Sequence, residues 1–164
     1  MTLSPEGLIT FICGEKESGK TSRCLQIASE ALGAGHRVSG IVCEHIYENG
    51  QRIAITAKNL GDGENRTLAR RPEASREAAT IQTAHWGFDE SVLAWGNEVF
   101  GRAVPTDVLI VDEIGILEFE RNQGWLLAIQ ALESGKYSRA FVSLRPSLVS
   151  LVKKRWPTAN WISL

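Results

Sequence analysis

The chain of 164 residues lacks the features that define several classes of protein. Its cysteines are few and odd in number, and they fall in expected strands or a helix: Cys13, Cys24 and Cys43. We therefore expect small buried hydrophobic residues in a reducing compartment, and no disulfide framework or thiolate metal site. The net charge of −1 gives no electrostatic reason to expect nucleic acid or an anionic membrane as a partner.

The sequence also lacks long apolar runs, internal repeats and low-complexity tracts. No stretch approaches the length of a membrane-spanning helix, and residues 1–6 lack the basic and apolar regions of a signal peptide. We therefore expect a cytoplasmic protein that does not associate with membranes. With 164 residues, 43 % of them hydrophobic, the expectation is a single domain over residues 1–164 with its own core.

What the sequence does contain is a glycine-rich stretch that matches the phosphate-binding pattern G-x-x-x-x-G-K-[ST]. An apolar run at residues 8–13 precedes it, and a stretch free of glycine and proline follows at 21–32, which predicts the order strand, loop, helix. The backbone N–H groups of such a loop and the dipole of its helix attract phosphate. The residues expected to bind a nucleoside triphosphate are Gly14, Glu15, Lys16, Glu17, Ser18, Gly19, Lys20 and Thr21.

The residues of this loop have distinct expected roles. Gly14 and Gly19 permit backbone angles and a close phosphate approach that a Cβ atom would obstruct. Lys20 is expected to reach the β- and γ-phosphates, and the Thr21 hydroxyl to ligate Mg²⁺. The acidic side chains within the loop must point outward, because bound phosphates would repel them.

The rest of the chain alternates between predicted strands and helices at both ends. Strands are predicted at 37–43, 108–111, 140–144 and 161–163, and helices at 89–100, 124–133 and 147–155. This order predicts an α/β fold with a mostly parallel sheet and helices on both of its faces.

A β-rich insertion at about 44–83 departs from this alternation. Asn49-Gly50 lies between two arms of alternating polarity, which predicts a β-hairpin, and short strands are predicted at 66–69 and 80–83. Residues 70–79 are polar and are expected to form a mobile loop. We therefore expect an antiparallel extension of the same domain.

Two carboxylates follow the apolar strand predicted at 108–111. Asp112 is expected to hold Mg²⁺, usually through water, and Glu113 to take a proton from a water molecule that attacks the γ-phosphate. Both would lie at the carboxyl edge of a parallel strand, where open α/β sheets bind their ligands.

Other polar and aromatic residues allow more than one interpretation. Arg145 follows the strand at 140–144 and either neutralises the γ-phosphate or is a surface arginine in a turn. Glu118 either holds other site residues in place or is a surface acid. His45 and His85 fit solvated positions better than catalytic ones. The tryptophans fit packing roles, and Trp86, in a predicted loop, is the one to test for stacking on a nucleobase.

The run Asp-Glu-Ile-Gly-Ile-Leu-Glu at 112–118 resembles the Asp-Glu-Ile-Gly-x-Met/Leu-Glu signature of a family of small P-loop nucleoside-triphosphatases, the thermophile and cancer-related type. The phosphate loop, Gly40-Ile41 before the hairpin and the turn at 61–64 are also similar to that family. The resemblance implies a RecA-like P-loop core with an extra strand between the strands of the two phosphate-site motifs. It also implies slow, Mg²⁺-dependent hydrolysis of ATP, GTP and other nucleoside triphosphates, with loose base selection. Many members have Lys and Met where this chain has Ile116 and Leu117.

Two other functions stay open at this point. One is a small-molecule or nucleotide kinase, with an arginine-rich lid supplied by Arg66, Arg70, Arg71 and Arg76. The other is a nucleotide-dependent switch or assembly factor that uses residues 70–79 and the hairpin as partner surfaces.

Glu113 beside Asp112 favours hydrolysis over these alternatives, because a water nucleophile benefits from an adjacent base. The prediction is therefore a nucleoside-triphosphate phosphohydrolase. Its expected catalytic residues are Lys20, Glu113 and Arg145, and its expected Mg²⁺ ligands are Thr21 and Asp112.

Overall fold

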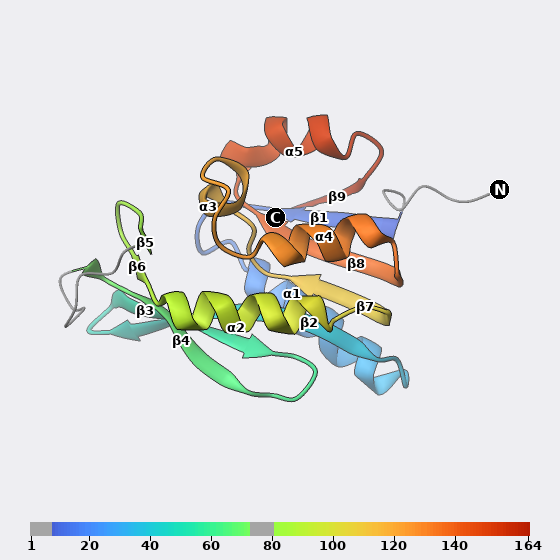
Figure 1. Ribbon diagram of the computed structural model, residues 1–164, viewed down its shortest axis with the longest axis horizontal. Helices are drawn as coiled ribbons and strands as arrows, with labels where there is room; N and C mark the ends of the chain where they lie inside the picture. Colours follow the sequence, from blue (N-terminus) through green and yellow to red (C-terminus); the bar gives the residue numbers. More distant parts are fainter. Residues whose placement is uncertain (1–7, 73–80) are drawn as a thin grey trace.

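The computed structural model describes residues 8–72 and 81–164, which form one sheet of nine strands in the order β5-β6-β4-β3-β2-β7-β8-β1-β9 (Figure 1). The strands are β1 (Ile9–Cys13), β2 (Val38–Glu48), β3 (Gln51–Asn59), β4 (Asn65–Arg70), β5 (Ile81–Gln82), β6 (Gly87–Phe88), β7 (Thr106–Val111), β8 (Tyr137–Leu144) and β9 (Asn160–Ser163). The helices are α1 (Lys20–Gly33), α2 (Glu90–Gly101), α3 (Ile116–Phe119), α4 (Leu126–Ser134), the 3₁₀ turn η3 (Pro146–Leu148) and α5 (Val149–Arg155).

The parallel half of the sheet consists of β2, β7, β8, β1 and β9, which all run in the same direction. Because parallel strands need crossover connections, helices link them across the faces of the sheet. Their carboxyl ends meet at one edge, which is where the phosphate loop, Asp112 and Arg145 emerge. Strand β8 lies between β1 and β7, so the expected extra strand between the two phosphate-site motifs is confirmed.

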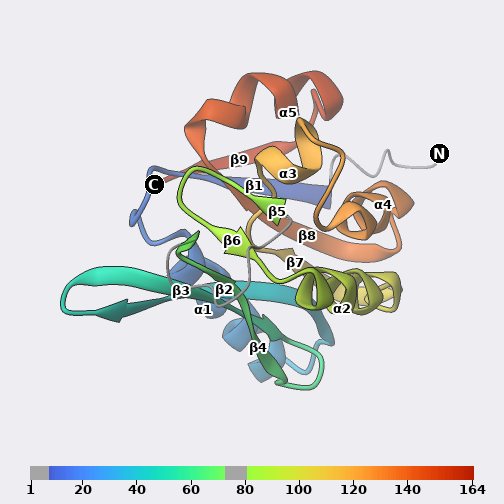
Figure 2. The same ribbon diagram turned by 60° about the vertical axis from the view of Figure 1, so that its left-hand side comes forward.

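The antiparallel half consists of β3, β4, β6 and β5, which continue the sheet beyond β2. Asn49 and Gly50 form the predicted turn between β2 and β3, and both have positive φ angles (52° and 77°), as the tight hairpin turn requires. The β2–β3 hairpin projects past the ends of the parallel strands, on the same side as the phosphate loop (Figure 2). The expected antiparallel extension is thus confirmed.

Helices cover both faces of the sheet, as predicted. Helix α1 packs on one face, while α2, α4 and α5 lie on the other (Figures 1 and 2). Strand β7 shows why both faces are apolar: Val108 and Ile110 pack in the cluster with α1, and Leu109 and Val111 pack in the larger cluster on the opposite face. The alternation of side chains along a doubly covered strand gives a continuous apolar run in the sequence.

Glycine is required where β2 approaches β7. Gly40 has a φ angle of 116°, and a Cβ atom added there would lie 1.9 Å from the carbonyl oxygen of Ile110. Such a distance is a backbone clash, so only glycine lets β2 pair in this register. The pairing matters for the site because β2 continues from here to Cys43, beside Asp112.

Several boundaries differ from the sequence-based prediction. The strand predicted at 37–43 and the first arm of the predicted hairpin form one continuous strand, β2, which ends at Glu48, and α4 begins at Leu126, two residues after the predicted start at about 124. The short helix α3 and strand β6 were not predicted, and Arg70 belongs to β4 rather than to a loop. The rest of the loop predicted at 70–79 lies largely outside the described residues.

The three cysteines are free thiols, half-buried at Cys13 and buried at Cys24 and Cys43, as expected. Burial raises the pKa of the Cys24 and Cys43 thiols well above its ordinary value. Within the described ranges, no helix is long and apolar enough to cross a membrane.

Candidate functional site

The phosphate loop connects β1 to α1. A Cβ atom on Gly14 would lie 2.2 Å from the Ser18 hydroxyl, so the loop closes only around glycine. Gly19 adopts a φ of 95° directly before the first residue of α1, which turns the chain into the helix. The side chains of Glu15, Lys16 and Glu17 are exposed, as the outward orientation expected for the loop acids requires.

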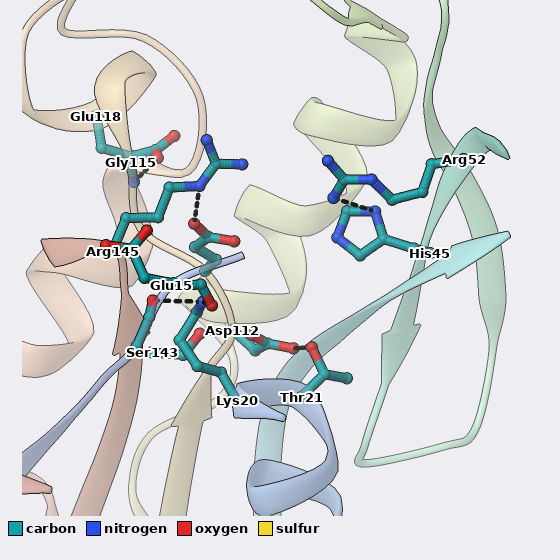
Figure 3. A network of polar contacts seen from close by, with 12 residues as sticks. Glu15, Lys20, Thr21, His45, Arg52, Asp112, Gly115, Glu118, Ser143 and Arg145 are labelled. Carbon is teal, nitrogen blue, oxygen red and sulfur yellow. Dashed lines mark hydrogen bonds and ion pairs between the residues drawn. The ribbon is translucent and has the colours of Figure 1, made fainter. Parts of the chain in front are cut away.

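Lys20 is buried at the start of α1, with 8 % of its surface exposed. Its Nζ donates hydrogen bonds to the carbonyl oxygens of Gly14 at 2.8 Å and Glu15 at 2.9 Å (Figure 3). These bonds hold the ammonium group against the loop. A phosphate cradled by the loop would therefore meet a fixed positive charge as well as the backbone N–H groups.

Asp112 joins the end of β7 to the phosphate loop. Its Oδ2 accepts hydrogen bonds from Thr21 Oγ1 at 2.8 Å and from the backbone N–H of Cys43 at 3.1 Å (Figure 3). Its Oδ1 accepts a hydrogen bond from the Ser143 hydroxyl, which comes from β8. Burial raises the pKa of Asp112 above its ordinary value, while the bonds from Ser143, Cys43 and Thr21 act in the opposite direction.

Thr21 and Asp112 fit a magnesium ion. Magnesium takes hard oxygen ligands, and proteins usually supply one or two of them while water and substrate phosphates supply the rest. A hydroxyl and a carboxylate oxygen 2.8 Å apart beside a phosphate loop match this requirement. In the part of the chain that the structure describes, no group of three or more His, Cys, Asp and Glu side chains could form an all-protein metal site.

Glu113 and Arg145 form an ion pair at the carboxyl edge of the sheet. Arg145 Nε donates to Glu113 Oε1 at 3.1 Å, and the side chains are 45 % and 28 % exposed. The two residues follow β7 and β8, which are neighbours in the sheet, so the predicted placement of Arg145 near Asp112 and Glu113 is confirmed. Contact with solvent leaves the Glu113 carboxylate accessible to water.

Glu118 is a partly buried carboxylate that holds two backbone groups. Its Oε1 accepts from Gly115 N–H at 2.9 Å and its Oε2 from Trp125 N–H at 3.0 Å. It thereby ties the segment that follows Glu113 to the start of α4. Burial raises the pKa of Glu118 to about 7. Glu118 had two possible roles: a surface acid, or a residue that holds other site residues in place. These hydrogen bonds support the second role.

Three side chains near the site were not predicted to belong together: His45, Arg52 and Trp86. The Arg52 guanidinium lies 3.4 Å from His45 Nδ1 and 5.9 Å from the centre of the Trp86 ring. Arg52 and Trp86 are buried and His45 is half-buried, so His45 is not the solvated residue expected. The sequence did contain a signal for Arg52. It lies two residues before the buried Ala54 on β3, so both side chains are on the same, inward face of the strand.

Among the arginines expected to form a kinase lid, Arg66 and Arg71 have different partners in the described structure. Arg66 pairs with Glu64 at 2.8 Å and lies over the Trp95 ring. It lines a pocket of about 440 Å³ with Ser39 at the start of β2, away from the ends of the parallel strands. Arg71 Nε donates to the Arg52 carbonyl at 2.6 Å. Arg76 lies outside the described residues.

Comparisons with known proteins agree with this architecture. A family model described as NTPase matches residues 9–155. The nucleoside-triphosphatase THEP1 of Methanopyrus kandleri is 34 % identical over 112 residues, which cover 68 % of this chain and 59 % of that relative, less than two thirds of its length. The nucleoside-triphosphatase THEP1 of Methanocaldococcus jannaschii is 27 % identical over 127 residues, covering 77 % of this chain and 72 % of that relative.

The crystal structure of THEP1 from the hyperthermophile Aquifex aeolicus superposes with a TM-score of 0.71 at 20 % identity, covering 95 % of this chain and 89 % of that one. At this identity the likeness concerns the fold. It agrees with the α/β P-loop architecture expected from the sequence.

Proposed function

The chain belongs to the NTPase family, and we propose that it hydrolyses nucleoside triphosphates to the diphosphate and inorganic phosphate. One observation carries the proposal: the 2.8 Å hydrogen bond from Thr21 Oγ1 to Asp112 Oδ2, which places the carboxylates that end β7 beside the phosphate loop. A loop alone would serve any triphosphate-binding protein, whereas this junction brings a magnesium pair and a neighbouring carboxylate, Glu113, to the same place.

The loop holds the triphosphate in this proposal. Its backbone N–H groups and the N-terminus of α1 bind the phosphate oxygens, and Lys20 contacts the β- and γ-phosphates. Thr21 and Asp112 hold magnesium, which neutralises charge on the β- and γ-phosphate oxygens when it is bound. The loop acids are exposed, so solvent screens their charge from the bound phosphates.

Glu113 supplies the base for the reaction. The water oxygen attacks the γ-phosphorus, the bond from that phosphorus to the β–γ bridging oxygen breaks, and the Glu113 carboxylate takes the water proton. Arg145, 3.1 Å from Glu113 Oε1, orients the carboxylate and, in this proposal, also neutralises charge on the terminal phosphate.

Base selection is expected to be loose, as the resemblance to the family implies. Many members carry a lysine where this chain has Ile116, which is 43 % exposed. If that lysine assists catalysis in relatives, this chain works without it, and its turnover is expected to be slow.

The test is phosphate release by the purified protein with ATP, GTP, CTP or UTP, in Mg²⁺ and in EDTA. We expect release from several nucleotides only with Mg²⁺, and none from the Lys20→Ala variant. The Lys136→Ala variant is the control, since Lys136 is exposed and precedes β8 at the opposite edge of the sheet.

Two outcomes would overturn the proposal. Tight Mg²⁺–nucleotide binding without phosphate release would favour a switch whose partner supplies catalysis. Transfer of the γ-phosphate to an added hydroxyl compound, in place of release to water, would favour a kinase.

A further inference from the structure

Arg52 is a buried arginine with no carboxylate partner among residues 8–72 and 81–164. It is 8 % exposed, and its guanidinium contacts are His45 Nδ1 at 3.4 Å and the face of Trp86 at 5.9 Å. A buried charge without a counter-charge is costly, and proteins keep such groups mainly where a ligand or a reaction needs them. The group therefore calls for an anionic partner that the described side chains do not provide.

The contact with His45 positions the guanidinium without neutralising it. Burial lowers the pKa of His45; the charges of Asp112 and Glu17 raise it and those of Arg145 and Lys20 lower it, and the net shift is downward. The imidazole is therefore neutral near pH 7, and its Nδ1 accepts a hydrogen bond from Arg52. Trp86 offers the negative face of its ring to the cation. Both neighbours hold the side chain in place and leave its charge free to act on a ligand.

Arg52 lies across from the catalytic ion pair. The guanidinium groups of Arg52 and Arg145 point toward one another from opposite sides, with Lys20, Thr21 and Asp112 below them (Figure 3). Burial lowers the pKa of Arg52, as do the charges of Arg145 and Arg71, whereas Glu113 raises it. Two arginines that repel each other beside a phosphate loop are the arrangement that a bound phosphate would stabilise.

The hairpin brings Arg52 to this position. The turn at Asn49-Gly50 pairs Arg52 with Tyr47, and the Tyr47 hydroxyl donates to Glu17 Oε1 of the phosphate loop at 3.1 Å. Arg71, directly after β4, donates a hydrogen bond from its Nε to the Arg52 carbonyl at 2.6 Å. The chain thus places an arginine opposite its own phosphate loop, with no need for a second protein.

We infer that Arg52 binds the terminal phosphate of the nucleoside triphosphate from the side opposite the phosphate loop and stabilises its charge during transfer to water. An arginine is suited to this role because its planar donors match phosphate oxygens and its charge persists at all working pH values. The catalytic part of the inference rests on the proposed function, whereas the binding part does not require turnover.

The experiment compares affinities for a non-hydrolysable ATP analogue and for ADP, both with Mg²⁺, in the wild type and in Arg52→Met. Methionine keeps an unbranched apolar stem and removes the charge. We expect affinity for the analogue to fall about tenfold or more, with ADP affinity within about twofold of wild type, because only the triphosphate has the phosphate that Arg52 contacts. The kcat for phosphate release should fall by about 10²-fold or more.

Arg66→Met is the matched control, since Arg66 lies on the neighbouring strand and is exposed and paired with Glu64. It should leave the ratio of the two affinities unchanged. Arg52→Lys keeps the charge with fewer donors and should restore part of the ratio, and it decides the question if the methionine variant does not fold.

Equal losses of ATP-analogue and ADP affinity would overturn the inference, because they would place Arg52 at the base or ribose or in a purely structural role. An unchanged ratio in both Arg52 variants would also overturn it. If the wild type releases no phosphate, the proposed hydrolase function fails, while the ratio of affinities still tests Arg52.

Discussion

The parallel and antiparallel halves of the sheet build the phosphate site in different ways. The parallel half contributes Lys20, Thr21, Asp112 and Glu113. These residues lie in two short sequence motifs: the first two end the phosphate-loop motif, and the last two are adjacent at the end of β7. The antiparallel half contributes Arg52, which faces the site only because a hairpin carries it there. Substitutions in the parallel half should therefore lower the affinity for Mg²⁺–ATP or the rate of hydrolysis. Substitutions in the antiparallel half should instead change how strongly the protein prefers a triphosphate to a diphosphate.

The largest effect is expected from Lys20→Ala in the parallel half. Lys20 is buried against the loop and supplies charge to two phosphates, so affinity for Mg²⁺–ATP should fall by about 10³-fold, as measured by calorimetry or fluorescence. Affinities within a few-fold of wild type would show that the loop does not bind the phosphates, and the exposed Lys136→Ala variant controls for loss of a lysine.

Glu113→Gln, also in the parallel half, should slow hydrolysis without weakening nucleotide binding. The amide cannot take a proton from water, so kcat should fall by about 10²-fold or more with Mg²⁺–ATP affinity retained. Single-turnover phosphate release measures this step directly. The exposed Glu120→Gln, a short distance along the chain, should leave the rate unchanged. Wild-type turnover in Glu113→Gln would show that another group accepts the proton.

Glu118→Gln should change how stability depends on pH. The folded protein holds the Glu118 proton up to about pH 7, whereas the unfolded chain releases it near the ordinary pKa of 4.5. The folded state therefore binds more protons between these pH values, and the free energy of unfolding falls as the pH rises through this window.

This contribution is on the order of 3 kcal/mol in the wild type and should be absent from Glu118→Gln. Urea denaturation at pH 5 and pH 8 measures it. If the free energy of unfolding falls as much between pH 5 and pH 8 in the variant as in the wild type, titratable groups other than Glu118 cause the fall. Glu120→Gln serves again as the control.

Arg145→Met tests the second arginine at the terminal phosphate. Its loss removes the partner of Glu113 and one cationic contact, so kcat should fall by about tenfold. Arg139→Met, earlier on β8 and exposed, is the matched control. A kcat equal to that of the wild type would show that Arg145 is a surface arginine without a role in catalysis.

The smallest effect is expected from Tyr47→Phe. The hydrogen bond from Tyr47 to Glu17 is the surface link between hairpin and loop, and exposed contacts of this kind contribute little. We expect KM for ATP to change by less than about twofold in steady-state assays. A large increase would mean that this link, in addition to Arg52, connects the two halves.

The same contrast explains which features could be predicted from the sequence. The phosphate loop, the strand before Asp112 and the hairpin at Asn49-Gly50 each depend on neighbouring residues, so local patterns revealed them. The start of α4 was placed too early because Trp125 N–H is held by Glu118, seven residues earlier, and not by a local cap. Ser143 could not be assigned to Asp112, since only the sheet order brings β8 beside β7.

Arg52 illustrates the same limit for function. Its inward direction follows from the alternation along β3, but its neighbours His45 and Trp86 come from a separate strand and from the connection between β5 and β6. No spacing in the sequence links these residues to Asp112. Their proximity follows only from the antiparallel half folding toward the carboxyl edge of the parallel half.

The most direct test of the account is a crystal structure of the protein with Mg²⁺ and a non-hydrolysable ATP analogue. We predict the phosphates on the loop, Mg²⁺ beside Thr21 and Asp112, and the terminal phosphate between Arg52 and Arg145, facing Glu113. A triphosphate bound away from the loop, or a terminal phosphate turned away from Glu113 and Arg52, would contradict the account.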